Sequence, residues 1–193
     1  MADFPGALRA QLAGRVPITR AEWEARPAAV LVPLYRANGE WHLLLTQRTH
    51  TVETHKGQVA FPGGRAEAED ESPEVTALRE TEEEIGLPRD QVAVIGRLDE
   101  LLTVTQYRVT PVVGLIPWPW DFTLSTAELS AVFGVPLRWL ADPANLEIQH
   151  RQPLVPGPAV PVYYHYFGEY TIWGATARII RNFLEVAGPL LGI

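Results

Sequence analysis

The sequence predicts an α+β fold in which one domain has a mixed β-sheet covered by helices on both sides. Strand-like and helix-like segments interleave along the chain without a strict βαβ rhythm, which argues against a doubly wound parallel sheet. The chain has 193 residues, of which 47% are hydrophobic, and this is enough to bury a substantial core. The length fits one domain better than two.

The N-terminal region predicts a helical arm. Phe4, Leu8 and Leu12 share one stripe of an amphipathic helix, and a turn or second helix follows around Trp23. We therefore expect an arm or lid over residues 1–27, a main domain over 28–187 and a tail over 188–193.

Several β-rich runs predict the sheet. The residues 28–35 and 41–46 flank Asn38-Gly39, which is a strong hairpin signal. We expect further strands at 58–61, 92–98, 107–116 and 160–167, a turn at 62–64, and a C-terminal helix at 172–187. The segment 126–131 fits either a turn of helix or the entry into a strand that ends at Pro136.

An acidic helix is predicted between two terminal signals. Ser72 followed by Pro73 suits an N-cap and first helical position, and Gly86 suits the C-terminal cap, so the helix should span 73–85. At about 100° per residue, one face carries three glutamates and the opposite face is apolar. The acidic face has Glu80, Glu83 and Glu84, and the apolar face has Val75, Leu78 and Ile85.

The three clustered carboxylates repel one another and oppose the helix macrodipole at its C-terminal end. Hard oxygen ligands at this density suit Mg²⁺ or Mn²⁺, which commonly take their remaining ligands from water and a phosphorylated substrate. The alternative is an ordinary solvated acidic face.

Net charge and composition argue against several classes of function. A formal net charge of −7 argues against a general nucleic-acid binder, and no run approaches a membrane span or a signal peptide. The absence of cysteine excludes thiolate chemistry and suggests a reducing, cytoplasmic setting. The expected partner is a small molecule, and the sequence leaves a homodimer open.

A basic strip precedes the acidic one. Residues 48–65 carry one acid, Glu53, beside Arg48, His50, His55, Lys56 and Arg65, whereas residues 67–84 are strongly acidic. A basic strip beside a metal-binding acidic strip is a plausible cradle for a polyphosphate.

The residues 79–87 (RETEEEIGL), preceded by Gly63-Gly64, resemble the Nudix box REUxEExGU, in which U is a bulky aliphatic residue. Thr81 replaces the first aliphatic residue. The box is also one residue longer than usual, so either Asp70 or Glu71 takes the place of its early acid.

Three further segments resemble the coenzyme A pyrophosphatase branch of this family. They are 44–48 (LLTQR), 57–64 (GQVAFPGG) and 172–178 (IWGATAR). The chain departs from the branch pattern at Thr49, where the pattern has serine or alanine, and at Glu53, where the pattern has arginine. Because of the charge reversal at Glu53, other nucleotides stay open as substrates.

The resemblance implies a Nudix-like α/β/α sandwich around a mixed sheet and metal-dependent hydrolysis of coenzyme A to 3′,5′-ADP and 4′-phosphopantetheine. By the same resemblance, Glu80 and Glu84 are the principal Mg²⁺ (or Mn²⁺) ligands. Glu83 is a third ligand or the residue that activates water, with Glu128 as a second candidate base. Arg79 is a catalytic residue that orients a carboxylate.

Substrate contacts are expected from Arg48, Lys56, Gly63, Gly64 and Arg65. The tryptophans 118, 120 and 173 are candidates for stacking on adenine, although core packing is the more common role. Two rival functions stay open: the same chemistry on ADP-ribose or a dinucleotide, and a nucleotide-binding domain that does not cleave.

Overall fold

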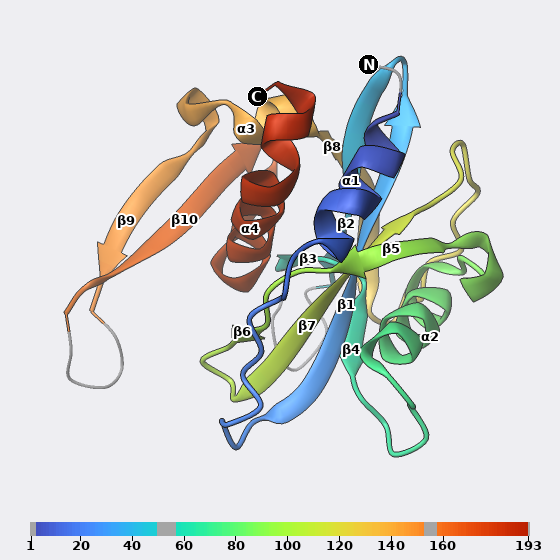
Figure 1. Cartoon of the computed structure of the whole chain (residues 1–193), viewed down its shortest axis with the longest axis horizontal. Coiled ribbons are helices and arrows are strands. Elements are labelled where there is room, and N and C mark those ends of the chain that lie inside the picture. Colours follow the sequence, from blue (N-terminus) through green and yellow to red (C-terminus); the bar gives the residue numbers. More distant parts are fainter. Residues whose placement is uncertain (1–2, 50–56, 153–157, 193) are drawn as a thin grey trace.

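The computed structural model describes residues 3–49, 57–152 and 158–192, and it has helices on both faces of a mixed sheet (Figure 1). The main sheet follows the order β3-β2-β1-β7-β5, with β8 also paired to β2, β4 to β1 and β6 to β7. Its strands are β1 (Arg26–Ala37), β2 (Glu40–Arg48), β3 (Val59–Ala60), β4 (Gly63–Arg65), β5 (Ala93–Arg97), β6 (Leu101–Leu102), β7 (Tyr107–Leu115) and β8 (Leu129–Pro136). A short 3₁₀ helix, η1 (Arg89–Gln91), precedes β5.

The predicted hairpin is confirmed. β1 and β2 are antiparallel, with Leu34 opposite Leu43, and their connection places Asn38 at φ 50° and Gly39 at φ 81°. These left-handed conformations favour the Asn-Gly sequence at a tight turn between strands. β1 pairs with β7 in the parallel sense, so the sheet is mixed as predicted.

Alternating side chains of β1 supply two separate cores. Leu31 and Tyr35 pack in the cluster under α2 (Pro73–Ile85), while Val32 and Leu34 pack in the cluster under α1 (Phe4–Ala13) and α4 (Gly174–Leu191). A strand that is buried on both faces has apolar residues at both parities, as β1 does. The helices therefore form two layers with the sheet between them, which confirms the predicted fold class.

The N-terminal helix α1 packs on the face of the sheet opposite α2. Phe4, Leu8 and Leu12 are buried, as their shared stripe predicts. Phe4 packs on Trp41 with ring centroids 5.2 Å apart, and Leu12 lies against Gly96 of β5. Trp23 lies in a turn and is 56% exposed.

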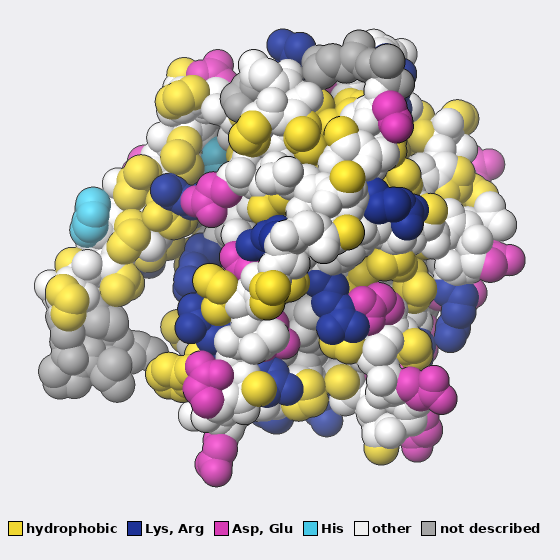
Figure 2. Space-filling model, in the orientation of Figure 1, with side chains coloured by type: hydrophobic (Ala, Val, Ile, Leu, Met, Phe, Trp, Pro, Cys, Tyr) yellow, Lys and Arg dark blue, Asp and Glu magenta, His cyan; other side chains and the backbone are white. Residues whose placement is uncertain are grey.

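A second, three-stranded sheet in the order β11-β10-β9 follows α3 (Leu137–Ala141) and the 3₁₀ helix η2 (Pro143–Asn145). Its strands are β9 (Glu147–Arg151), β10 (Val160–Phe167) and β11 (Tyr170–Trp173). The β9–β10 hairpin extends away from the rest of the protein, and Figure 2 shows open space between the far part of this hairpin and the body. Within the described residues, no helix is long and apolar enough to cross a membrane.

Two sequence-based expectations are wrong in detail. The turn expected at 62–64 is in part strand β4, because Gly63 and Gly64 pair with Val30 and Ala29 of β1. The C-terminal helix begins at Gly174 rather than at 172, since Ile172 and Trp173 pair with β10, and it runs on to Leu191. The segment 126–131 leads into strand β8, and β6, β9 and β11 are strands that the sequence pattern did not reveal.

Candidate active site

Helix α2 forms at the predicted residues. The Ser72 side chain accepts a hydrogen bond of 3.3 Å from the backbone N–H of Val75, and Gly86 ends the helix in the left-handed conformation at φ 67°. Thr81, which replaces an aliphatic residue of the box, is fully buried and donates its hydroxyl to the carbonyl of Ala77 at 2.6 Å. The threonine therefore packs with its polar group satisfied.

The glutamate-bearing face of α2 lies against the glycine strand β4. The backbone N–H of Gly63 donates a hydrogen bond of 3.1 Å to Oε2 of Glu84. The other glycine is equally close to the helix, because a Cβ atom on Gly64 would overlap the carboxylate of Glu80. Gly63 adopts φ 147°, and a side chain there would meet the backbone of Val30. Glycine at position 64 therefore lets the Glu80 carboxylate approach the backbone, and glycine at position 63 permits the positive φ and the close approach of β1.

Glu84 is an unusual carboxylate because it is only 6% exposed. Burial raises the pKa of Glu84 to about 7, although the Gly63 N–H and Arg48 favour its charged form. Burial also raises the pKa of Glu80, against the opposing effect of Arg79. Glu128 and Glu80 add repulsion at Glu84, so these acids form a site that would attract a cation.

Arg79 joins the acids of the box to a buried aspartate. Its Nη2 lies 2.9 Å from Oδ2 of Asp70, and its Nη1 lies 3.0 Å from Oε1 of Glu80 and 3.3 Å from Oε2 of Glu83. Asp70 also accepts hydrogen bonds from the Thr76 hydroxyl and from the Glu67 N–H. These contacts hold the pKa of Asp70 well below its usual range, with Arg79 as the largest cause. Of the two candidates for the early acid, Asp70 is the one that contacts Arg79.

Arg48, at the end of β2, reaches the same carboxylates. Its Nη1 lies 3.8 Å from Glu84 and its Nη2 lies 3.5 Å from Glu128. The Nε of Arg48 is buried and has no hydrogen-bond partner in the described part of the chain. The fold thus brings Glu128, which is 44 residues from Glu84 in sequence, to the site of the box.

The remaining predicted site residues differ in their placement. The side chain of Glu83 is 60% exposed and contacts Arg79, so it lies at the rim rather than on the glycine strand. Arg65 is exposed, and it contacts the cluster through its carbonyl oxygen, which accepts a hydrogen bond from Arg79 at 3.0 Å. Glu82 faces away from the cluster and pairs with Arg89 at 2.7 Å. The predictions for Lys56, His55 and Glu53 fall outside the described residues.

The donor set at this site fits a divalent cation. Among the described residues, no three acid or imidazole groups already converge as a metal cluster, because arginines lie between the carboxylates. The fit comes from the chemistry of the side chains. Glu80 and Glu84 offer hard oxygen donors, and burial destabilises the charged form of both. Both carboxylates also lie against the same glycine strand, β4. Nearby positive charge would offset that destabilisation.

The three segments that resemble the coenzyme A pyrophosphatase branch meet in the structure. The Thr46 hydroxyl of the first segment donates to the carbonyl of Ala60 in the second at 3.1 Å. The Thr176 hydroxyl of the third donates to the carbonyl of Val59 at 2.9 Å. The second segment continues into Gly63, which holds Glu84. Residues far apart in sequence therefore form one scaffold behind the carboxylates.

The candidate adenine-stacking residues are engaged in aromatic contacts within the chain. Trp118 stacks on Tyr35 with ring centroids 4.2 Å apart, and Trp173 stacks on Tyr164 at 5.9 Å. The Nε1 atom of Trp120 is buried and has no hydrogen-bond partner among the described residues. These contacts support the more common packing role for Trp120 and Trp173, whereas Trp118 is 44% exposed.

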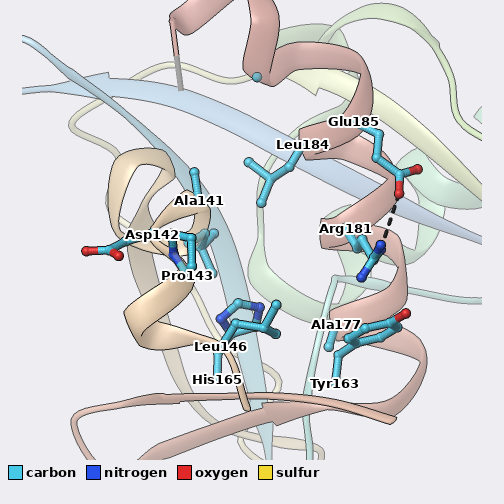
Figure 3. A pocket seen from close by; sticks show the side chains of 12 residues that line it. Ala141, Asp142, Pro143, Leu146, Tyr163, His165, Ala177, Arg181, Leu184 and Glu185 are labelled. Atoms are coloured by element: carbon cyan, nitrogen blue, oxygen red, sulfur yellow. Dashed lines mark hydrogen bonds and ion pairs between the residues drawn. The ribbon is translucent and has the colours of Figure 1, made fainter. Parts of the chain in front are cut away.

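A cavity of about 300 Å³ lies elsewhere, between α3, η2, β10 and α4 (Figure 3). Apolar side chains form most of its wall, His165 projects into it, and the ion pair of Arg181 with Glu185 lies at its side. None of the box carboxylates lines this cavity. It is therefore separate from the candidate active site.

Carboxylates that fit a divalent cation, held between a helix and a glycine strand, are suited to an enzyme that hydrolyses phosphate anhydrides. The model of the NUDIX domain matches residues 25–152, about two thirds of the chain. This chain belongs to the Nudix hydrolase family and is a pyrophosphohydrolase that acts on a nucleoside diphosphate derivative.

Known proteins are similar to this chain in sequence or in fold. The chain is 43% identical over 171 residues to NudL of Escherichia coli (strain K12), an uncharacterized Nudix hydrolase, and the match covers 87% of this chain and 86% of NudL. The fold is similar to that of RenU, a Nudix hydrolase from M. smegmatis, with a TM-score of 0.52 and 23% identity over 66% of this chain and 83% of RenU. A MutT/nudix family protein from Enterococcus faecalis gives a TM-score of 0.53 at 18% identity, over 91% and 66% of the two chains.

Proposed function

We propose that this Nudix hydrolase cleaves the pyrophosphate bond of coenzyme A and its derivatives in the presence of Mg²⁺ or Mn²⁺. The products from coenzyme A would be 3′,5′-ADP and 4′-phosphopantetheine. The observation that carries the proposal is the convergence of the three branch-like segments behind Glu84, through Thr46, Thr176 and Gly63. The absence of cysteine supports a further proposal, that the reaction takes place in the cytoplasm.

We assign Glu80 and Glu84 as the residues that hold the cation. When bound, a divalent ion neutralises phosphate oxygens and helps to activate the attacking water. Gly63 fixes the position of Glu84 through its N–H, and Arg79 fixes Glu80 while Asp70 holds Arg79 in place. This arrangement fixes the carboxylates in place before substrate binds, which is where most of the catalysis in phosphoryl transfer arises.

The reaction also needs a base and a contact to phosphate. Water attacks phosphorus, the bond from that phosphorus to the bridging oxygen breaks, and a base takes the proton of the water. Among the described residues, Glu83 and Glu128 are the candidate bases, one beside Arg79 and one beside Arg48. We assign Arg48 to the substrate, since its guanidinium lies beside Glu84 and can present two N–H groups to phosphate oxygens. Lys56 and Arg65 stay proposals for further phosphate contacts.

The proposal is tested by a substrate panel. The purified protein is incubated with coenzyme A, dephospho-coenzyme A, ADP-ribose or a dinucleotide, in the presence of Mg²⁺ or of a chelator. The products are separated by chromatography and identified by mass spectrometry. We expect 3′,5′-ADP and 4′-phosphopantetheine, fastest from coenzyme A and absent with chelator. Faster cleavage of ADP-ribose or the dinucleotide would leave the Nudix chemistry in place and overturn the coenzyme A assignment.

A further inference from the structure

The strand β9 is the outer edge of the second sheet. It pairs with β10 on one side, with Gln149 opposite Val162, and no strand of the described residues pairs with its other side. Four of its five residues are exposed. Figure 1 shows β9 as the outermost element of a hairpin that extends from the body, so its free edge faces solvent.

This edge lacks some of the features that protect edge strands against pairing. Such strands are commonly short, charged, bulged or interrupted by proline, and β9 is short and carries Glu147 and Arg151. The five residues of β9 (EIQHR) include neither proline nor lysine, and their pairing with β10 has no irregularity. An apolar side chain lies on this edge strand, since Ile148 is 47% exposed, and Val160 and Tyr166 of the neighbouring β10 are 43% and 51% exposed.

The sequence of β9 is complementary to itself in the antiparallel sense. A twofold axis perpendicular to the sheet at Gln149 places Glu147 of one copy opposite Arg151 of the other, twice by symmetry, and Ile148 opposite His150. This register pairs all five residues and matches both opposite charges. A register centred on Ile148 or on His150 loses both charge pairs and shortens the overlap within the strand.

In the structure, the charged side chains that this register pairs lie on one face of the sheet. Glu147, Gln149 and Arg151 alternate along the strand and lie opposite Tyr164, Val162 and Val160 of β10, so they share one face of the sheet. Gln149 bridges the other two, donating to Glu147 at 2.8 Å and accepting from Arg151 at 3.2 Å. The guanidinium of Arg151 also lies over the ring of Tyr164, 5.4 Å from its centroid.

We propose that two copies of this chain associate through antiparallel pairing of their β9 strands, which joins the two three-stranded sheets into one continuous sheet. This surface is independent of the coenzyme A assignment. A pairing of five residues is small beside a stable interface of roughly 1,600 Å². The dimer should therefore be weak and should become populated as the protein concentration rises.

Charge reversal tests the register. Wild-type protein should show a concentration-dependent increase in mass by sedimentation velocity. The variants Glu147→Arg and Arg151→Glu should each be monomeric, because each places like charges opposite one another twice. An equimolar mixture of the two should associate again, since every cross-strand pair is then of opposite charge. Circular dichroism checks that each variant is folded. A wild-type dimer that survives both reversals, or a wild-type protein that is monomeric at every concentration, would overturn the proposal.

The absence of cysteine allows a second test. The variant Gln149→Cys places one thiol of each copy at the proposed axis, and the control Val104→Cys places one at a site that is 87% exposed and lies outside this sheet. Under mild oxidation we expect disulfide-linked dimer from the first variant about tenfold faster or more, because pairing raises the local thiol concentration. Equal rates for the two variants would contradict pairing at Gln149.

Discussion

The backbone N–H of Gly63 lies 3.1 Å from Oε2 of Glu84, a carboxylate that is almost fully buried between α2 and the sheet. One end of this contact belongs to the glycine pair and the other to the acidic helix, 21 residues later in the chain. The carboxylate is fixed by the backbone before any substrate arrives. Such preorganisation is the structural basis of the site that we propose.

The glycine next to this contact should be intolerant of a side chain. In Gly64→Ala the added methyl group would overlap the carboxylate of Glu80 and force it to move. We expect kcat to fall by about tenfold to a hundredfold, because small displacements of a catalytic group are costly. The control Gly14→Ala adds a methyl group with ordinary contacts at 3.4 Å and should keep full activity. Steady-state kinetics of both variants would show the difference, and an unimpaired Gly64→Ala enzyme would contradict the proposed role of Glu80.

The aspartate behind Arg79 should support both stability and activity. Asp70→Asn removes the charge that holds Arg79 and leaves the guanidinium with weaker partners. We expect a loss of about 1 to 3 kcal/mol in the free energy of unfolding, together with a fall in kcat as Glu80 loses its orientation. Denaturant titration and kinetics measure the two effects.

The neighbouring acid provides the control for this prediction. Glu71 is exposed, and in Glu71→Gln we expect a change within about 0.5 kcal/mol. Equal effects of the two substitutions would show that Asp70 is not the acid that positions Arg79.

The buried His165 should make stability depend on pH. Its Nδ1 lies 2.9 Å from the carbonyl of Asn145, and burial lowers the pKa of His165 in the folded chain. Because the unfolded histidine then binds protons more readily, the contribution of His165 to the free energy of unfolding should fall as the pH drops below about 6.5. Glu84 contributes in the opposite sense, because its raised pKa favours the folded chain as the pH falls, so the prediction concerns the difference between wild type and variant. In His165→Gln this part of the pH dependence should disappear. Denaturant titrations from pH 5 to 8 would measure it, and an unchanged slope in the variant would contradict the assignment.

The sequence predicts the acidic helix and the β1–β2 hairpin well because their signals are local. Ser72, Pro73 and Gly86 mark the helix ends, and Asn38-Gly39 marks the turn, so no distant contact is needed to place them. The stripe of Phe4, Leu8 and Leu12 is read from periodicity in the same way.

The elements that were missed depend on partners distant in the chain. Gly63 and Gly64 have weak strand propensity and read as a turn, but β1 supplies the pairing that makes them a strand. Ile172 and Trp173 fit the helical pattern of the following residues, yet pairing with β10 draws them into the sheet. β9 is largely polar and has no alternating pattern to reveal it.

The acidic residues of the candidate site can be predicted from the sequence, but their contacts with the arginines and their burial cannot. The spacing of Glu80, Glu83 and Glu84 predicts one acidic face opposite the packing face, but Glu84 is buried with Ala77 and Ile85, and Glu83 is mostly exposed. The choice between Asp70 and Glu71 depended on a loop path that sequence spacing does not determine. The arrangement of Arg48 between Glu84 and Glu128 depends on tertiary packing of β2, α2 and the segment before β8.

The most direct test of the proposed site is the activity of Glu84→Gln on coenzyme A at saturating Mg²⁺, beside the control Glu82→Gln on the opposite face of α2. We predict a loss on the order of a hundredfold or more in kcat/KM for Glu84→Gln, with cooperative unfolding retained, and near wild-type activity for Glu82→Gln. Near wild-type activity of a folded Glu84→Gln enzyme would contradict the assignment of Glu84 as a residue that holds the cation.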